Sequence, residues 1–174
     1  MKALTLTQPW ATLVAIGAKE IETRSWQTHY PGPLAIHAAV GLGPVGGIDG
    51  LRSLCCTEPF ISALRGGGID MDQVDVDALP RGAIIATARI ADVRCIVHHW
   101  MEPVDPAVIG DRLPLPNDPE LTFGDYTPGR FAWLLADMRP LATLIPCRGA
   151  LGLWTVPDDV AAIVERDALE RATR

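Results

Sequence analysis

The fold of this chain is decided around ten residues near its N-terminus, Gly17-Ala18-Lys19-Glu20-Ile21-Glu22-Thr23-Arg24-Ser25-Trp26. An apolar run over residues 11–16 precedes them. This run predicts a short helix that ends at Gly17, because glycine is common just after a helix end. Beyond the glycine, side chains alternate as they do in a β-strand. The stretch therefore predicts a helix followed by a strand over residues 19–26, with Glu22 and Arg24 on one strand face.

The strand face that carries Glu22 and Arg24 is a candidate binding surface. Residues two apart on one face lie about 7 Å apart, since a strand rises about 3.3 Å per residue. A carboxylate and a guanidinium at that spacing can hold one small polar ligand between them, or they can pair with each other. Strict alternation turns Lys19 away from Glu22, so Lys19 would join this face only through a twist or bulge where the strand begins.

Several motifs follow one another along the chain. They are Gln8-Pro9-Trp10-Ala11, Gly17-x-Lys19-x-x-Glu22-x-Arg24, Pro33-Leu34-Ala35-Ile36-His37-Ala38, Gly82-Ala83-Ile84-Ile85-Ala86, Gly129-Arg130-Phe131-Ala132-Trp133-Leu134-Leu135 and Gly149-Ala150-Leu151-Gly152-Leu153-Trp154. Their succession over residues 3–157 resembles an ASCH domain, the activating-signal-cointegrator homology family. The resemblance implies a PUA-like fold, a small and partly open β-barrel with a cleft between the barrel and the first helix. It also implies recognition of RNA or of a nucleobase.

The same resemblance implies an alternative, enzymatic function. Some small bacterial members remove the acetyl group from N-acetylated cytidine with a lysine, a threonine and a glutamate. Two residues separate the lysine and the threonine in those members, and that pattern falls here on Lys19 and Glu22. The threonine is therefore replaced by glutamate, and Thr23 is expected on the opposite strand face. Since a buried lysine can act as a base or nucleophile and a carboxylate can activate water, Lys19 and Glu22 are candidate catalytic residues of an amidohydrolase or ribonuclease.

Aromatic residues near the same strand suit stacking on a base. Trp26 ends the polar strand and Trp133 or Tyr30 could supply a second ring, while Glu22 or Arg24 reads the edge of the base. Trp133 lies in an apolar strand, so a place in the core is its alternative. His37 either lies in the core or lines the pocket opposite Arg24. The candidate ligand-binding residues are therefore Glu22, Arg24, Trp26, His37 and Trp133.

The rest of the chain predicts an α+β domain of about six strands with short helices packed around them. Residues 82–97 predict the central strand, and two further strands are expected over residues 131–138 and 141–145. The proline-rich residues 103–128 predict an irregular surface excursion, a lid or an insertion. Trp10 recurs with Leu13 and Val14 at helical spacing, which favours a core position.

Two units are expected, an ASCH domain over residues 1–157 and an amphipathic helix over residues 158–174. One stripe of that helix carries its apolar side chains, namely Val160, Ile163, Val164 and Ala168. This helix or the proline-rich excursion could instead serve a protein partner, which is a third class of function. The sequence leaves the oligomeric state open.

Composition limits the partners. The chain has 174 residues, 48% of them hydrophobic, and no apolar run near the ~20 residues that cross a bilayer. Without a signal-peptide pattern, a cytoplasmic location is expected. The net charge of −6 argues against extensive binding of duplex nucleic acid but leaves a nucleoside or a short single strand open. Neither the acidic residues 70–77 nor His98-His99 has the ligand pattern of a calcium or zinc site, so no metal and no cofactor is predicted.

Overall fold

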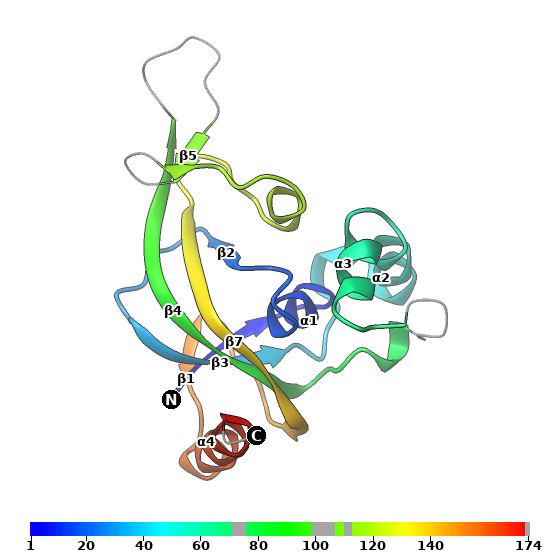
Figure 1. Ribbon diagram of the computed structural model, residues 1–174, viewed down its shortest axis with the longest axis vertical. Helices are drawn as coiled ribbons and strands as arrows, with labels where there is room; N and C mark the ends of the chain where they lie inside the picture. The colour runs from blue at the N-terminus through cyan, green and yellow to red at the C-terminus, as the bar shows by residue number, and fades with distance from the viewer. Residues whose placement is uncertain (71–75, 99–106, 110–112, 173–174) are drawn as a thin grey trace.

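The computed structural model describes residues 1–70, 76–98, 107–109 and 113–172. Its centre is one curled sheet in which six strands follow the order β2-β7-β4-β3-β1-β8 (Figure 1). Two long strands, β4 (Ala83–His98) and β7 (Phe131–Pro146), pair antiparallel and carry the curl. The predicted α+β fold, a partly open PUA-like β-barrel with short helices around it, is thereby confirmed.

The remaining elements are short. The other strands are β1 (Lys2–Leu6), β2 (Ile21–Arg24), β3 (Gly32–Ala38), β5 (Ala107–Ile109), β6 (Leu113–Pro114) and β8 (Leu153–Thr155). The helices are α1 (Trp10–Ala15), α2 (Gly47–Cys55), α3 (Phe60–Gly66) and α4 (Asp158–Ala172), with 3₁₀ turns η1 (Gly43–Val45), η2 (Val76–Ala78) and η3 (Glu120–Phe123). β5 and β6 form a small ribbon on the far end of β4.

Helix α1 lies in the hollow of the curled sheet, where it packs against β3, β4 and β7 (Figure 1). Residues 11–15 of α1 are all buried. The buried Gln8 side chain fixes the helix start: its Oε1 accepts the Thr12 N–H at 3.2 Å, and its Nε2 donates to the Pro80 carbonyl at 2.7 Å. The helix ends as predicted at Gly17, whose φ of 76° is left-handed and suits glycine.

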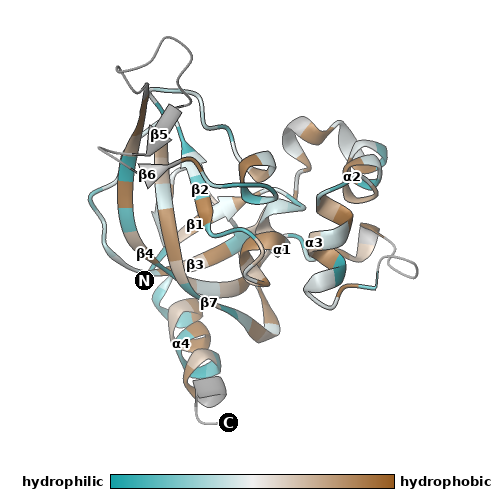
Figure 2. Cartoon of the chain, turned by 45° about the horizontal axis from the view of Figure 1, so that its top comes forward, coloured by the Kyte–Doolittle hydropathy of each residue, from teal (hydrophilic) through white to brown (hydrophobic). Residues whose placement is uncertain are grey.

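Three groups of apolar side chains hold the layers together. The first fills the hollow between α1 and the sheet and includes Leu4, Val14, Ile36 and Trp133. The second lies under α4 and includes Ala3, Ile84, Leu141 and Val164. The third joins α1 to α2, α3 and η3 and includes Leu13, Leu51, Leu64 and Phe123. In Figure 2 apolar stretches run along β4 and β7, the strands that the first two groups share.

Three sequence-based boundaries need correction. Residues 131–146 form one strand rather than two, because β4 pairs with the whole length and absorbs the break in shifts of register. Asp137, within this strand, has a φ of 56°. The expected strand over residues 19–26 is a true strand only over Ile21–Arg24. In α4, Ala161 rather than Ile163 is buried, since Ile163 is 42% exposed.

None of the helices within the described ranges is both long enough and apolar enough to cross a membrane. Helix α4 packs on β7, and the Asp167 carboxylate accepts the backbone N–H of Ala142 at 3.0 Å. The helix beyond residue 157 thus shares a core with the sheet.

Candidate functional site

A cavity of about 640 Å³ lies where the curled sheet fails to close. Its walls come from β1, from β2, from the start of α1, and from the segment that follows η3. The residues that line it include Thr5, Trp10, Glu22, Arg24, Asp125 and Leu151. The cavity therefore lies between strands β1 and β2 and the start of α1.

Arg24 spans the open seam of the barrel. β2 is one end of the sheet order, and β1 lies near the other end. The Arg24 Nη2 group donates to the Thr5 carbonyl of β1 at 3.3 Å, so one side chain bridges the two edges. Its Nε lies 3.0 Å from Glu22 Oε1, but its N–H points at no acceptor among the described residues, so this contact is ionic rather than a hydrogen bond.

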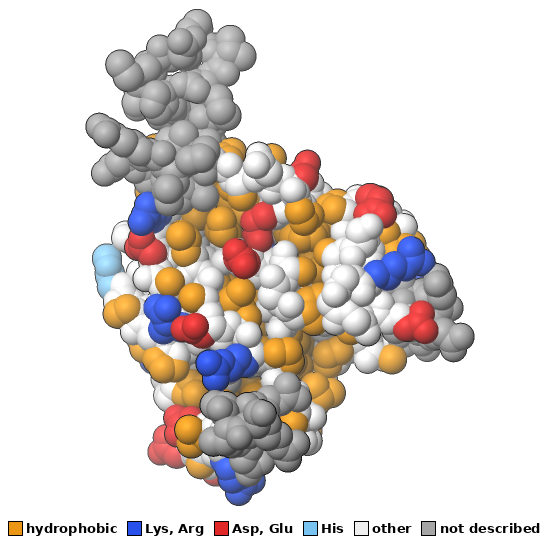
Figure 3. Space-filling view, viewed as in Figure 1, with side chains coloured by type: hydrophobic (Ala, Val, Ile, Leu, Met, Phe, Trp, Pro, Cys, Tyr) orange, Lys and Arg blue, Asp and Glu red, His pale blue; other side chains and the backbone are white. Residues whose placement is uncertain are grey.

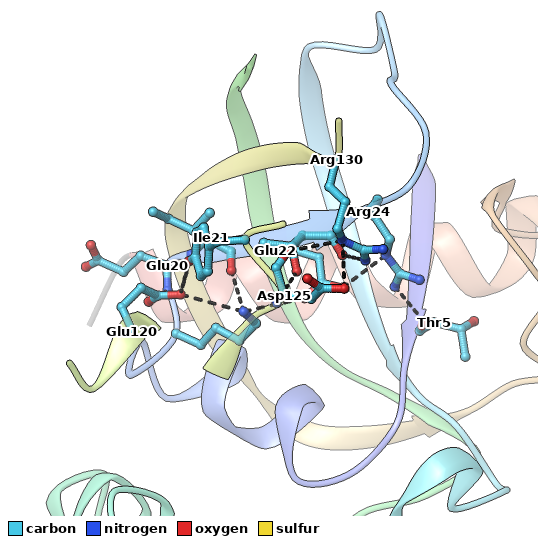
Figure 4. Close-up of polar contacts among 11 residues, drawn as sticks. Thr5, Glu20, Ile21, Glu22, Arg24, Glu120, Asp125 and Arg130 are labelled. Atoms are coloured by element: carbon cyan, nitrogen blue, oxygen red, sulfur yellow. Dashed lines mark hydrogen bonds and ion pairs between the residues drawn. The ribbon is translucent and has the colours of Figure 1, made fainter. Parts of the chain in front are cut away.

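Glu22 is the centre of a row of charges that Figure 4 shows from Glu120 at one end to Arg24 at the other. Besides Arg24, its Oε2 lies 3.7 Å from Lys19 Nζ. The Glu22 residue is 8% exposed, so little water screens these charges. The two residues that the sequence placed on one strand face are thus brought together at the cavity, paired with each other.

Lys19 belongs to this row, between Glu120 and Glu22, but it does not line the cavity. It is 1% exposed, its Nζ donates to the Ile21 carbonyl, and it contacts both Glu22 and Glu120. Strict alternation would have turned it away. Because β2 begins only at Ile21, Lys19 precedes the strand, and its own N–H donates to the Leu13 carbonyl at 3.1 Å. The alternation along β2 therefore does not determine the direction of the Lys19 side chain.

Glu120 is a site residue that sequence reasoning missed. Its carboxylate accepts the N–H groups of Glu20 at 2.7 Å and Ile21 at 3.2 Å, and it lies 3.6 Å from Lys19 Nζ. Burial raises its pKa, while the Lys19 charge and these hydrogen bonds act in the opposite direction. The only signal in the sequence was its place in the excursion expected to act as a lid or insertion.

A second charged pair anchors the cavity wall after η3. Arg130 Nε donates to the Asp125 carbonyl at 3.1 Å and lies 3.2 Å from the Asp125 carboxylate. The Asp125 N–H donates to the Thr23 hydroxyl at 3.0 Å, which ties the wall to β2. Hydrogen bonds from Thr127 and the nearby Arg130 charge hold the pKa of Asp125 below its usual range.

The three aromatic candidates of the sequence lie outside the cavity lining. Trp133 is fully buried, its ring meets Trp26 edge-on at 4.6 Å, and its Nε1 donates to the Trp26 carbonyl at 3.3 Å. His37 is buried too, with Nε2 2.9 Å from the Cys147 carbonyl. The aromatic residues that do line the cavity are Phe123, which is buried, and Trp10, which is half-buried. Trp10 also packs against the third apolar group, as its helical spacing predicted.

The model of the ASCH domain matches residues 4–142, which is most of the chain. The chain belongs to the ASCH domain family. At the level of the family, an ASCH domain is a PUA-like fold associated with RNA binding. A comparison with curated proteins found no match to this sequence.

On the face that Figure 3 shows, the described residues form no continuous basic field. Lys and Arg side chains are separated there and alternate with Asp and Glu. Among the described residues, no group of three or more His, Cys, Asp or Glu side chains is placed to hold a metal ion. Residues 71–75 of the acidic stretch, and His99, lie outside the described residues.

Proposed function

We propose that this ASCH domain binds RNA or a modified nucleobase, with one base held in the cavity between the barrel and α1. The observation that carries the proposal is the pairing of Glu22 and Arg24 in a cavity that Trp10 lines. A volume of about 640 Å³ is in the range of sites for small organic ligands.

The lining offers the contacts that a base needs. A carboxylate such as Glu22 accepts hydrogen bonds from amino and imino groups, while the Arg24 guanidinium donates to carbonyl and ring nitrogen atoms. Trp10 presents an aromatic ring on which a base can stack. Arg24 Nε has no acceptor among the described residues, so a ligand acceptor would satisfy a buried donor.

The nature of the partner follows from the charges. Glu22 and Asp125 pair with the arginines nearest the cavity, and the chain is acidic, so a nucleoside or a short single strand is favoured over duplex nucleic acid. No cofactor is part of this proposal. The four cysteines are free thiols, which suits the reducing cytoplasm.

A hydrolase that uses Lys19 and Glu22 is the second candidate. The observation in its favour is the buried Lys19 ammonium, 3.7 Å from the Glu22 carboxylate at the cavity wall. Against it, Lys19 already contacts two carboxylates and a carbonyl and does not line the cavity. Binding without turnover is therefore the function that we favour.

Calorimetric titration of the full chain tests the binding proposal. The ligands are the four ribonucleosides, N4-acetylcytidine and short single-stranded RNAs. We expect Glu22→Gln and Arg24→Gln each to weaken binding by about 1.5–3 kcal/mol, the value of a hydrogen bond to a charged group. Glu165→Gln and Arg166→Gln, exposed on α4, are the matched controls and should leave affinity unchanged. Absence of binding by every ligand would refute the proposal.

The same ligands, incubated with the protein and followed by chromatography, decide between binding and hydrolysis. Release of acetate or of RNA fragments by the wild type, lost in Lys19→Met and Glu22→Gln, would establish the hydrolase instead. We expect the ligands to remain intact. Circular dichroism of both variants is needed as a control, because Lys19 is buried between charges.

A further inference from the structure

The turn over residues 148–152 forms one rim of the cavity and carries an apolar side chain outward. Ala150, Leu151 and Gly152 line the cavity, and Leu151 is 99% exposed. A single exposed leucine is ordinary on a protein surface. This one is different in its setting, because it stands at the mouth of the proposed base-binding cavity.

The turn is held firmly from behind. At its base, the Cys147 carbonyl lies 2.9 Å from His37 Nε2, and the Cys147 N–H donates to the Gly82 carbonyl at 3.1 Å. Gly149 packs so closely on the His37 ring that a Cβ at this position would lie 2.6 Å from His37 Nδ1. The exposure of Leu151 is therefore imposed by an anchored turn rather than by a loose end of chain.

The turn also brings a cation that is not already neutralised. The two arginines that line the cavity, Arg24 and Arg130, contact Glu22 and Asp125 respectively. Arg148 is exposed, and its guanidinium forms no ion pair with any residue in the described part of the chain. A phosphate group beside the cavity could therefore pair with the Arg148 guanidinium.

We propose that the occupant of the cavity is one nucleotide of a single RNA strand and that the adjacent nucleotide lies across residues 148–152. Its base rests on Leu151 and its phosphate faces Arg148. This inference rests on the proposed function, since it concerns the continuation of the ligand beyond the same cavity. A free nucleoside brings no phosphate to face Arg148 and no second base to cover the exposed side of Leu151.

The test compares a nucleoside with the same nucleoside inside a strand. Titrations of the full chain use the best-bound nucleoside and a pentanucleotide that carries it at the centre with uridines on both sides. We expect the pentanucleotide to bind about tenfold more tightly, a gain of the order that one extra base contact and one phosphate contact provide. The Leu151→Ser, Arg148→Gln double variant should lose this gain, so that its affinities for the nucleoside and for the pentanucleotide become nearly equal.

The matched control is Leu144→Ser with Arg166→Gln, which changes an exposed leucine of β7 and an exposed arginine of α4. It should retain the full gain. Equal affinities for nucleoside and pentanucleotide would overturn the inference while the proposed function stands, and so would a gain that survives in the double variant. If the protein bound neither the nucleoside nor the pentanucleotide, both this inference and the proposed function would be overturned.

Discussion

The Lys19 ammonium lies 3.6 Å from the Glu120 carboxylate, although the two residues are far apart in the sequence. The Glu120 carboxylate also accepts hydrogen bonds from two backbone N–H groups, those of Glu20 and Ile21. These contacts together hold η3 against the start of β2. Residues 122–125, which follow directly, form one wall of the cavity. The position of that wall therefore depends on Glu120, a residue that would not itself touch a ligand in the cavity.

Replacement of Glu120 should destabilise the fold. Glu120→Ala leaves the N–H groups of Glu20 and Ile21 without their acceptor and removes one partner of the buried Lys19. We expect the free energy of unfolding to fall by about 3 kcal/mol, as measured by urea denaturation. Glu165→Ala, an exposed glutamate of α4, should change it by less than about 0.5 kcal/mol. Equal effects of the two substitutions would show that the Glu120 contacts contribute nothing measurable.

His37 should make stability depend on pH. Burial lowers its pKa from the ordinary value of 6.5, and its hydrogen bond to Cys147 opposes this only in part. The unfolded chain then takes up a proton at a higher pH than the folded protein does. Stability is therefore lost as pH falls from 6.5 toward the lowered pKa of the fold, by at most about 1.4 kcal/mol per pH unit, and is unaffected above that window.

Urea denaturation at a series of pH values measures this effect. His37→Gln keeps a side-chain N–H for the Cys147 carbonyl but does not titrate. The difference in unfolding free energy between wild type and variant should thus be constant above pH 6.5 and change below it. A difference that stays constant across the whole range would contradict the expected shift.

The sequence predicted the parts of the site that local geometry controls. Alternation along β2 was enough to place Glu22 and Arg24 together, and Gly17 was enough to end α1. Local spacing could not reveal Glu120, because its partners are backbone groups at the far end of a long connection. It also could not distinguish Trp10 in the core from Trp10 at a cavity, since both positions have the same helical period.

The predictions of strand boundaries and of the buried helix face were wrong for a similar reason. Residues 131–146 contain Asp137 in a left-handed conformation, which looks like the end of a strand when seen alone. Pairing with β4 continues on both sides of it, and that partner lies some fifty residues earlier in the chain. The buried face of α4 likewise depends on how the helix meets β7, which one stripe of apolar residues does not determine.

Helix α4 offers a test of that packing. Val164 is fully buried against the sheet, whereas its neighbour Ile163 is 42% exposed. We expect Val164→Ala to lower the free energy of unfolding by about 2 kcal/mol, because it removes two buried methyl groups and leaves a cavity. Ile163→Ala removes more carbon but should cost less than about 1 kcal/mol. The reverse order in thermal or urea unfolding would mean that Ile163, and not Val164, is the residue that packs against the sheet.

The ring that stacks on a bound base is the last point to test. The sequence favoured Trp26, but its ring packs edge-on against Trp133, while Trp10 lines the cavity. We therefore expect Trp10→Leu to weaken nucleoside binding by about 1–3 kcal/mol, the usual contribution of one base–aromatic stack. Trp26→Leu should instead lower the free energy of unfolding, since it removes the edge contact with Trp133, and should leave affinity within about twofold. Calorimetric titration of both variants at a temperature where each is folded separates the two roles. Loss of affinity in Trp26→Leu with none in Trp10→Leu would restore Trp26 as the stacking residue and move the base out of this cavity.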